Sequence, residues 1–159
     1  MDVRGLSGGL LSVVNPKATD FVAFSSCAGI LLEGRFICLE ELVRIINFDG
    51  PYSDRKILKN ELWDCGTLHE RNNIIGGDLN MTLLVVKVWG IVKAYPLSNC
   101  FISHFRDAYL FDVICLEVLN PTWRNARVGG GGVEECLDCF IMSNSFLDSV
   151  GRYRSGFVN

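Results

Sequence analysis

The segment from Asn72 to Asn80 constrains the fold of this chain more than any other feature. Residues 74–77 (Ile-Ile-Gly-Gly) have the short length and apolar character of a buried strand, and residues 78–80 (Asp-Leu-Asn) form a polar tip. Side chains two residues apart on an extended segment point to the same side. The pattern therefore predicts a carboxylate and a carboxamide side by side at the end of a strand.

Short apolar segments rich in β-branched residues predict further strands on both sides of this one. They cover residues 9–14, 20–25, 29–38, 42–48 and 137–142. A turn at Asn15-Pro16 makes the first two a predicted strand pair. Helical spacing of apolar residues predicts helices over 53–66 and 98–110, and 144–151 is predicted as a short helix or turn. The glycines at 129–132 predict a surface loop.

Length and composition fit a single globular unit. With 159 residues, of which 49% are apolar, the chain can build one core and is too short for two domains. Strands with interspersed helices favour an α/β (α+β) class, without demanding a purely parallel sheet. We therefore expect one domain over residues 1–159.

Asp78 and Asn80 are the first candidates for chemistry. Metal-assisted cleavage of a phosphodiester uses a carboxylate to hold or deprotonate the attacking water and an amide to donate a hydrogen bond to phosphate. Taken alone, however, Gly-Asp-Leu-Asn favours a plain turn after a strand, because these polar residues and glycine are common turn residues.

Five blocks, in a fixed order, change that balance. They are residues 46–56 (Ile-Asn-Phe-Asp-Gly-Pro-Tyr, then Ser-Asp-Arg-Lys), 77–80 (Gly-Asp-Leu-Asn), 121–125 (Pro-Thr-Trp-Arg-Asn), 137–143 (Leu-Asp-Cys-Phe-Ile-Met-Ser) and 151–155 (Gly-Arg-Tyr-Arg-Ser). Together they resemble the endonuclease domain of plant LINE-type non-LTR retrotransposons, within the DNase I-like endonuclease/exonuclease/phosphatase superfamily. The resemblance covers residues 8–155, and through it Asp78 and Asn80 are interpreted as descendants of an active site.

The resemblance implies an incomplete four-layer α/β/β/α sandwich of DNase I-like type and Mg²⁺-dependent hydrolysis of DNA phosphodiesters. It assigns the nucleophilic water and the phosphate to Asp78 and Asn80, with Asp78 also the metal ligand. Asp138 corresponds to an aspartate that orients a later histidine, and Asn47 and Trp123 correspond to substrate-binding positions.

Departures from the family pattern predict that the chain is inactive. The sequence is truncated at both ends relative to the family, so it lacks the strands that carry an Asn and the metal-binding Glu, and the closing Ser-Asp-His motif. Asp49 replaces the family's tyrosine, and His69 and His104 stand in the wrong contexts to replace the missing histidine. Loss of one general acid–base group alone costs on the order of 10²–10⁴ in rate. We therefore expect a degenerate endonuclease-like domain that need not bind Mg²⁺.

Two alternatives stay open at this point. An active metal-dependent phosphodiesterase requires unconventional ligands such as Asp49 or Glu33. A non-catalytic binding or structural protein would keep only the scaffold. Cys136 and Cys139 are spaced like half of a zinc site, but without a second suitable pair we expect two ordinary thiols.

Charge and hydropathy bear on partners and location. The net charge of −3 argues against nonspecific binding to DNA, the partner that the resemblance implies. The apolar stretch 83–97 is short and contains Lys87 and Lys93, so no membrane span is expected, and no secretory signal is recognised. Seven scattered cysteines suit a reducing compartment, and we expect an intracellular protein, nuclear or cytoplasmic. Exposed sheet edges and the β-prone stretch 81–89 predict self-association.

Overall fold

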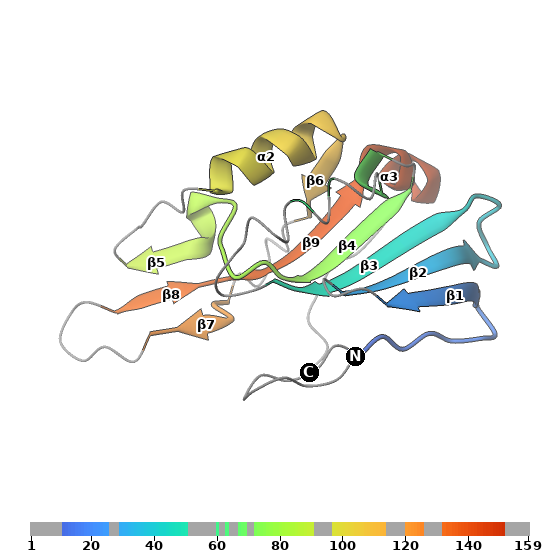
Figure 1. Cartoon of the computed structure of the whole chain (residues 1–159), viewed down its shortest axis with the longest axis horizontal. Coiled ribbons are helices and arrows are strands. Elements are labelled where there is room, and N and C mark those ends of the chain that lie inside the picture. The colour runs from blue at the N-terminus through green and yellow to red at the C-terminus, as the bar shows by residue number, and fades with distance from the viewer. Residues whose placement is uncertain are drawn as a thin grey trace.

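The computed structural model describes residues 11–25, 29–50, 60, 63, 67–69, 72–90, 97–113, 120–125 and 132–151. These residues form a six-stranded sheet, a three-stranded sheet and helices packed on the larger sheet (Figure 1). The mixed α+β class expected from the sequence is confirmed. Within the described ranges, no helix has the length and apolar content needed to cross a lipid bilayer.

The larger sheet positions the candidate site through one parallel pair of strands. Its order is β1 (Thr19–Ser25), β2 (Gly29–Phe36), β3 (Val43–Asp49), β4 (Asn73–Asp78), β9 (Asp138–Ser143) and β6 (Leu110–Asp112). Neighbours are antiparallel except β3 and β4, which run parallel. Parallel strands end at the same edge of a sheet, so the residues that follow β3 and β4 lie side by side there.

The smaller sheet continues from the larger one. It is ordered β5 (Val88–Gly90), β8 (Val133–Glu135) and β7 (Trp123–Arg124), and the short helix η2 (Val85–Lys87) precedes β5. Only residues 136 and 137 separate β8 from β9, so the two strands run on from one sheet into the other (Figure 1).

Two cores cover opposite faces of the larger sheet. The helix α2 (Ser98–Asp107) buries Phe101 and Phe105 against a cluster that includes Ile75 and Ile141. The helix α3 (Asn144–Val150) buries Phe146 in a second cluster. That cluster contains Val43, Ile74 and Met142. Because Ile74 and Ile75 are consecutive in a strand, the clusters lie on opposite faces, called here the α2 face and the α3 face.

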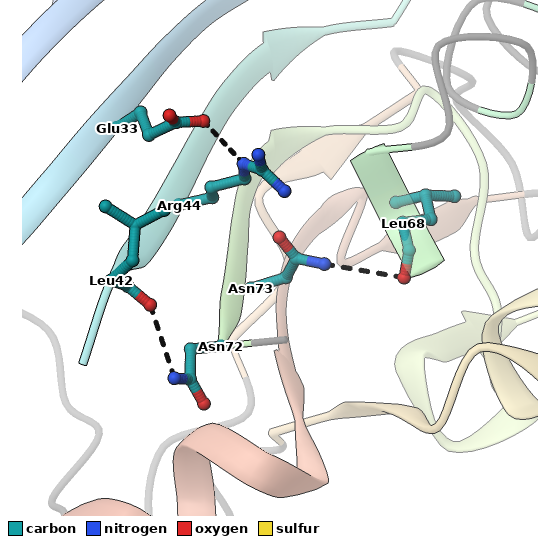
Figure 2. A network of polar contacts seen from close by, with 6 residues as sticks. All are labelled: Glu33, Leu42, Arg44, Leu68, Asn72 and Asn73. Carbon is teal, nitrogen blue, oxygen red and sulfur yellow. Dashed lines mark hydrogen bonds and ion pairs between the residues drawn. The ribbon is translucent and has the colours of Figure 1, made fainter. Parts of the chain in front are cut away.

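Polar contacts fix the beginning of β4 beside β3 (Figure 2). The Asn72 amide donates to the Leu42 carbonyl at 3.2 Å, and the Asn73 amide donates to the Leu68 carbonyl at 3.4 Å. Asn72 has a left-handed backbone conformation with φ of 59°, which asparagine adopts more readily than most residues. Arg44 and Glu33 form an ion pair at 2.6 Å across β3 and β2.

Most predicted elements are confirmed, with boundaries shifted by a few residues. The strands over 20–25, 29–38, 42–48 and 137–142 correspond to β1, β2, β3 and β9, and 144–151 contains α3. The Ser143 hydroxyl caps α3 by accepting from the Phe146 N–H, and Gly151 follows the helix with φ of 62°. The helix predicted over 98–110 ends at Asp107, because Tyr109 turns the chain with φ of 54° into β6.

One predicted strand pair is wrong. Residues 11–14 are not in a strand, and β1 pairs with β2 instead. The Asn15 turn is present, since the Asn15 carbonyl accepts from the Ala18 N–H at 2.9 Å. Residues 9–10 and 129–131, the block at 152–155 and most of the helix predicted over 53–66 lie outside the described residues. Within that helix Asn60 and Trp63 are described, and both are helical.

Candidate functional site

Three aspartates occupy one row across adjacent strands. Asp49 of β3 is the register partner of Asp78 of β4, and Asp78 is in turn the partner of Asp138 of β9. Two positions along the same ladders, in the next row on the same face, Asn47 is the partner of Gly76, and Gly76 is the partner of Phe140. The structure thus brings Asn47, Asp78 and Asp138 to neighbouring positions, although 91 residues separate the first from the last in the sequence.

The side chains of Asp78 and Asn80 build the turn that follows β4. The Asn80 N–H donates to Asp78 Oδ1 at 2.5 Å, and the Asn80 side-chain amide donates to the Gly50 carbonyl. The Gly50 N–H donates back to the Asp78 carbonyl at 2.6 Å. Asn80 is left-handed, with φ of 53°, and an aspartate accepting from the residue two positions on is a known turn geometry. The plain-turn interpretation is therefore correct at the level of structure, whatever these residues did chemically.

Glycine at position 77 permits the close approach of β3 and β4 at this edge. Gly77 has φ of 135°, a conformation that side chains disfavour. A Cβ placed there would collide with the Phe48 carbonyl. The backbone geometry thus requires glycine at position 77, immediately before Asp78.

Trp123 lies near the row without joining it. The Thr122 N–H donates to the Glu135 carbonyl at 3.0 Å, and the Leu137 N–H donates to the Thr122 hydroxyl at 3.1 Å. These bonds hold β7 beside the strand that leads to Asp138. Trp123 itself is the register partner of Glu135 in the smaller sheet and is 40% exposed.

The amide of Asn47 is already engaged. Its Nδ2 donates to the Leu11 carbonyl and to the Ser12 hydroxyl, each at 3.1 Å. A residue predicted to bind substrate thus contacts a segment that lies 35 residues earlier in the chain.

The two histidines of the chain lie on other elements than the aspartate row. His104 belongs to α2, with its Nδ1 2.6 Å from the Cys100 carbonyl oxygen and its ring edge-on to Trp63 at 4.3 Å between centroids. His69 ends the short helix η1 (Thr67–His69) and is exposed.

The donor groups that the structure describes near the aspartate row do not form a metal site. In the parts of the chain that the structure describes, no three His, Cys, Asp or Glu side chains form a group able to hold a metal ion. The aspartates are in register along the backbone, but Asp78 Oδ1 already accepts from the Asn80 N–H. These residues do not present a preformed Mg²⁺ site, so no chemical step is derived through the ion.

A buried ion pair on the α2 face, opposite the face of the aspartates, was not predicted from the sequence. Lys87 Nζ lies 2.7 Å from Asp112 Oδ2, and the two side chains are 6% and 9% exposed. Sequence reasoning used Lys87 only as an argument against a membrane span. A lone lysine inside the apolar stretch 81–89 is itself a signal, since a buried lysine requires a charged partner.

Cys136 and Cys139 are buried free thiols next to this ion pair. Burial raises the pKa of the Cys136 thiol, and the Lys87 ammonium partly offsets that rise. Burial, followed by the charge of Asp112, raises the pKa of the Cys139 thiol well above its usual value. Both groups are therefore neutral at pH 7, which makes them poor nucleophiles.

Comparison with known proteins supports the fold. No protein-family model matches the chain, and no curated protein matches it significantly. The solved structures that match include the endonuclease domain of TRAS1, a telomere-specific non-LTR retrotransposon, with a TM-score of 0.64 and 14% sequence identity. The match covers 86% of this chain and 60% of that domain's length. The chain thus shares its mixed α+β fold with a retrotransposon endonuclease domain, consistent with a DNase I-like fold.

Proposed function

We propose that this chain is a degenerate endonuclease-like domain of the plant LINE type, which descends from a Mg²⁺-dependent DNA endonuclease and no longer cleaves DNA. The observation that carries the proposal is the alignment of Asp49, Asp78 and Asp138 across three neighbouring strands of a retrotransposon-endonuclease fold. The turn after β4 accounts for Asp78, but it does not explain the two carboxylates beside it, because like charges directly opposite each other in a sheet are destabilising.

The contacts of the row support the loss of cleavage. Asp78 Oδ1 and the Asn80 side-chain amide already form hydrogen bonds within the turn after β4. Asp49 places a third carboxylate where the resembled family has the neutral phenol of a tyrosine. The negative charge of this carboxylate repels a phosphodiester. Any contact with DNA is proposed to run through Asn47 and Trp123, the substrate-binding positions that the resemblance implies.

A nicking assay tests the proposal. Supercoiled plasmid is incubated with the protein and Mg²⁺ or Mn²⁺, with Asp78→Ala as the matched variant and circular dichroism confirming that both are folded. We expect no nicking by either protein. Nicking by the natural sequence that disappears in Asp78→Ala would establish an active phosphodiesterase instead.

A second proposal, self-association through a sheet edge, has its own support. β1 is an edge strand of the larger sheet, and its Val22 and Phe24 are 58% and 51% exposed. A long apolar edge strand favours pairing with another chain. Light scattering after size exclusion should show a dimer or larger species that Val22→Lys disrupts. Val85→Lys is the control, because Val85 is 70% exposed but lies in η2; a clean monomer would refute the proposal.

A further inference from the structure

Residues 11–14, called here the N-terminal strap, lie against the α3 face of the larger sheet. The strap contacts Asn47 of β3. The Asn47 side chain points to the same face of the sheet as Ile45, two residues earlier in β3, and as Ile74, the partner of Ile45 in β4. Ile45 packs in the cluster beneath α3. The strap therefore lies against this face at Asn47, the β3 member of a row that continues through Gly76 and Phe140 and is the neighbour of the aspartate row on the same face.

The strap is held weakly. Its Leu11 and Val13 side chains are 79% and 84% exposed, so their burial contributes little. Among the described residues, its only hydrogen bonds are the two from the Asn47 amide. A segment with few apolar contacts and few hydrogen bonds opens readily.

The two groups that Asn47 contacts have the chemistry of a phosphodiester oxygen. The Leu11 carbonyl and the Ser12 hydroxyl both accept a hydrogen bond from Nδ2. Asparagine side chains also donate to phosphate oxygens in protein–DNA contacts. The same N–H groups cannot serve the strap and a phosphate together, so the two acceptors exclude each other.

We propose that the N-terminal strap is a displaceable cover, which occupies the Asn47 amide and must leave before a phosphodiester can bind there. This inference rests on the proposed function, because it takes Asn47 as the phosphodiester contact. Closure of the strap lowers the apparent affinity, because only the open molecules bind and the intrinsic affinity is multiplied by their fraction. Weakening the strap should therefore strengthen binding without adding any contact to the ligand.

The test uses the dinucleoside phosphate TpT and NMR spectroscopy of the full chain. In the free protein we expect nuclear Overhauser contacts between the Asn47 side-chain amide and Ser12, which disappear as TpT is added. Ser12→Ala removes one of the two acceptors and should tighten TpT binding by about twofold to tenfold, the range that one hydrogen bond supplies. Ser25→Ala, an exposed serine at the end of β1, should bind as the natural sequence does.

Each outcome decides a separate point. Equal TpT affinity of Ser12→Ala and the natural sequence overturns the cover while leaving phosphodiester binding intact. Persistence of the Asn47–Ser12 contact in the TpT complex does the same. Absence of that contact in the free protein refutes the cover whether or not TpT binds. If the contact is present and TpT binds to neither protein, the proposed phosphodiester site fails and the cover has no ligand to exclude.

Discussion

Asp78 and Asp138 are direct partners across the antiparallel ladder of β4 and β9. Asp49 flanks Asp78 on the other side, so the central carboxylate has a like charge on both neighbouring strands. Asp49 and Asp138 are exposed, and water therefore screens part of the repulsion. Even when screened, the repulsion among these three carboxylates disfavours folding.

Asp49→Asn should stabilise the protein. The change removes one like-charge neighbour of Asp78 at nearly constant shape, so the free energy of unfolding at pH 7 should rise by about 0.2–0.5 kcal/mol. The gain should shrink at high salt, because salt screens exposed charges. Urea unfolding at low and high ionic strength measures both effects. Glu40→Gln, at an exposed position between β2 and β3, is the control for net charge, and an equal gain there would mean that the row is not specifically repulsive.

Gly77→Ala should be strongly destabilising. The added methyl group meets the Phe48 carbonyl, and the backbone holds φ at 135°. We expect a loss of about 2–4 kcal/mol in the free energy of unfolding. Gly132→Ala is the matched control, because a Cβ there meets nothing within 4 Å and should change stability little. Equal effects of the two substitutions in urea unfolding would contradict the close approach of β3 and β4.

Lys87→Met should destabilise the protein through the charge that it leaves behind. Asp112 would remain buried without its partner, and breaking such a pair costs about 3–5 kcal/mol. The double variant Lys87→Met/Asp112→Leu removes both charges and should recover much of the loss. A double-mutant cycle from urea unfolding measures the coupling. A double variant no more stable than Lys87→Met would show that the ion pair is not the cause.

Stability should fall at alkaline pH because of the buried thiols. Burial raises the folded-state pKa of Cys139 above its usual value of 9.0, so above that pH the unfolded chain loses the proton first. The stability is fully present below pH 9.0 and is lost as the pH rises through the folded pKa, by at most about 1.4 kcal/mol per pH unit for one thiol. Urea unfolding between pH 8 and pH 10 (about the range that spans the ordinary thiol pKa) measures the slope. Cys139→Ala should flatten it, and an identical slope in that variant would assign the effect to another group.

Local patterns were sufficient to predict most strands of the larger sheet and the helix α2. Alternating or continuous apolar residues identified β1, β2, β3 and β9, and helical spacing identified α2. The strand over 9–14 failed, although its composition is equally apolar. Residues 11–14 find no strand partner among the described residues and contact the Asn47 side chain instead. A segment forms a strand only where another strand pairs with it, whatever its composition. The residues of one segment do not show whether such a pairing strand is present.

The short strands of the smaller sheet were also missed. β7 contains only Trp123 and Arg124, and β8 contains Val133 and two glutamates. Neither has an apolar alternation long enough to recognise. Their pairing follows from the position of β8 next to β9 and from the Thr122 contacts, which are long-range features.

The sequence by itself determined the mixed α+β class, most strands of the larger sheet and the Gly-Asp-x-Asn turn, because each depends on the periodicity or turn chemistry of nearby residues. Only the tertiary structure decided that Asp49, Asp78 and Asp138 share a row, that the strap occupies Asn47 and that Lys87 finds Asp112. Those relationships join residues far apart in the chain, and they follow from strand order, register and burial. Register is set by how whole faces pack, and no local pattern specifies it.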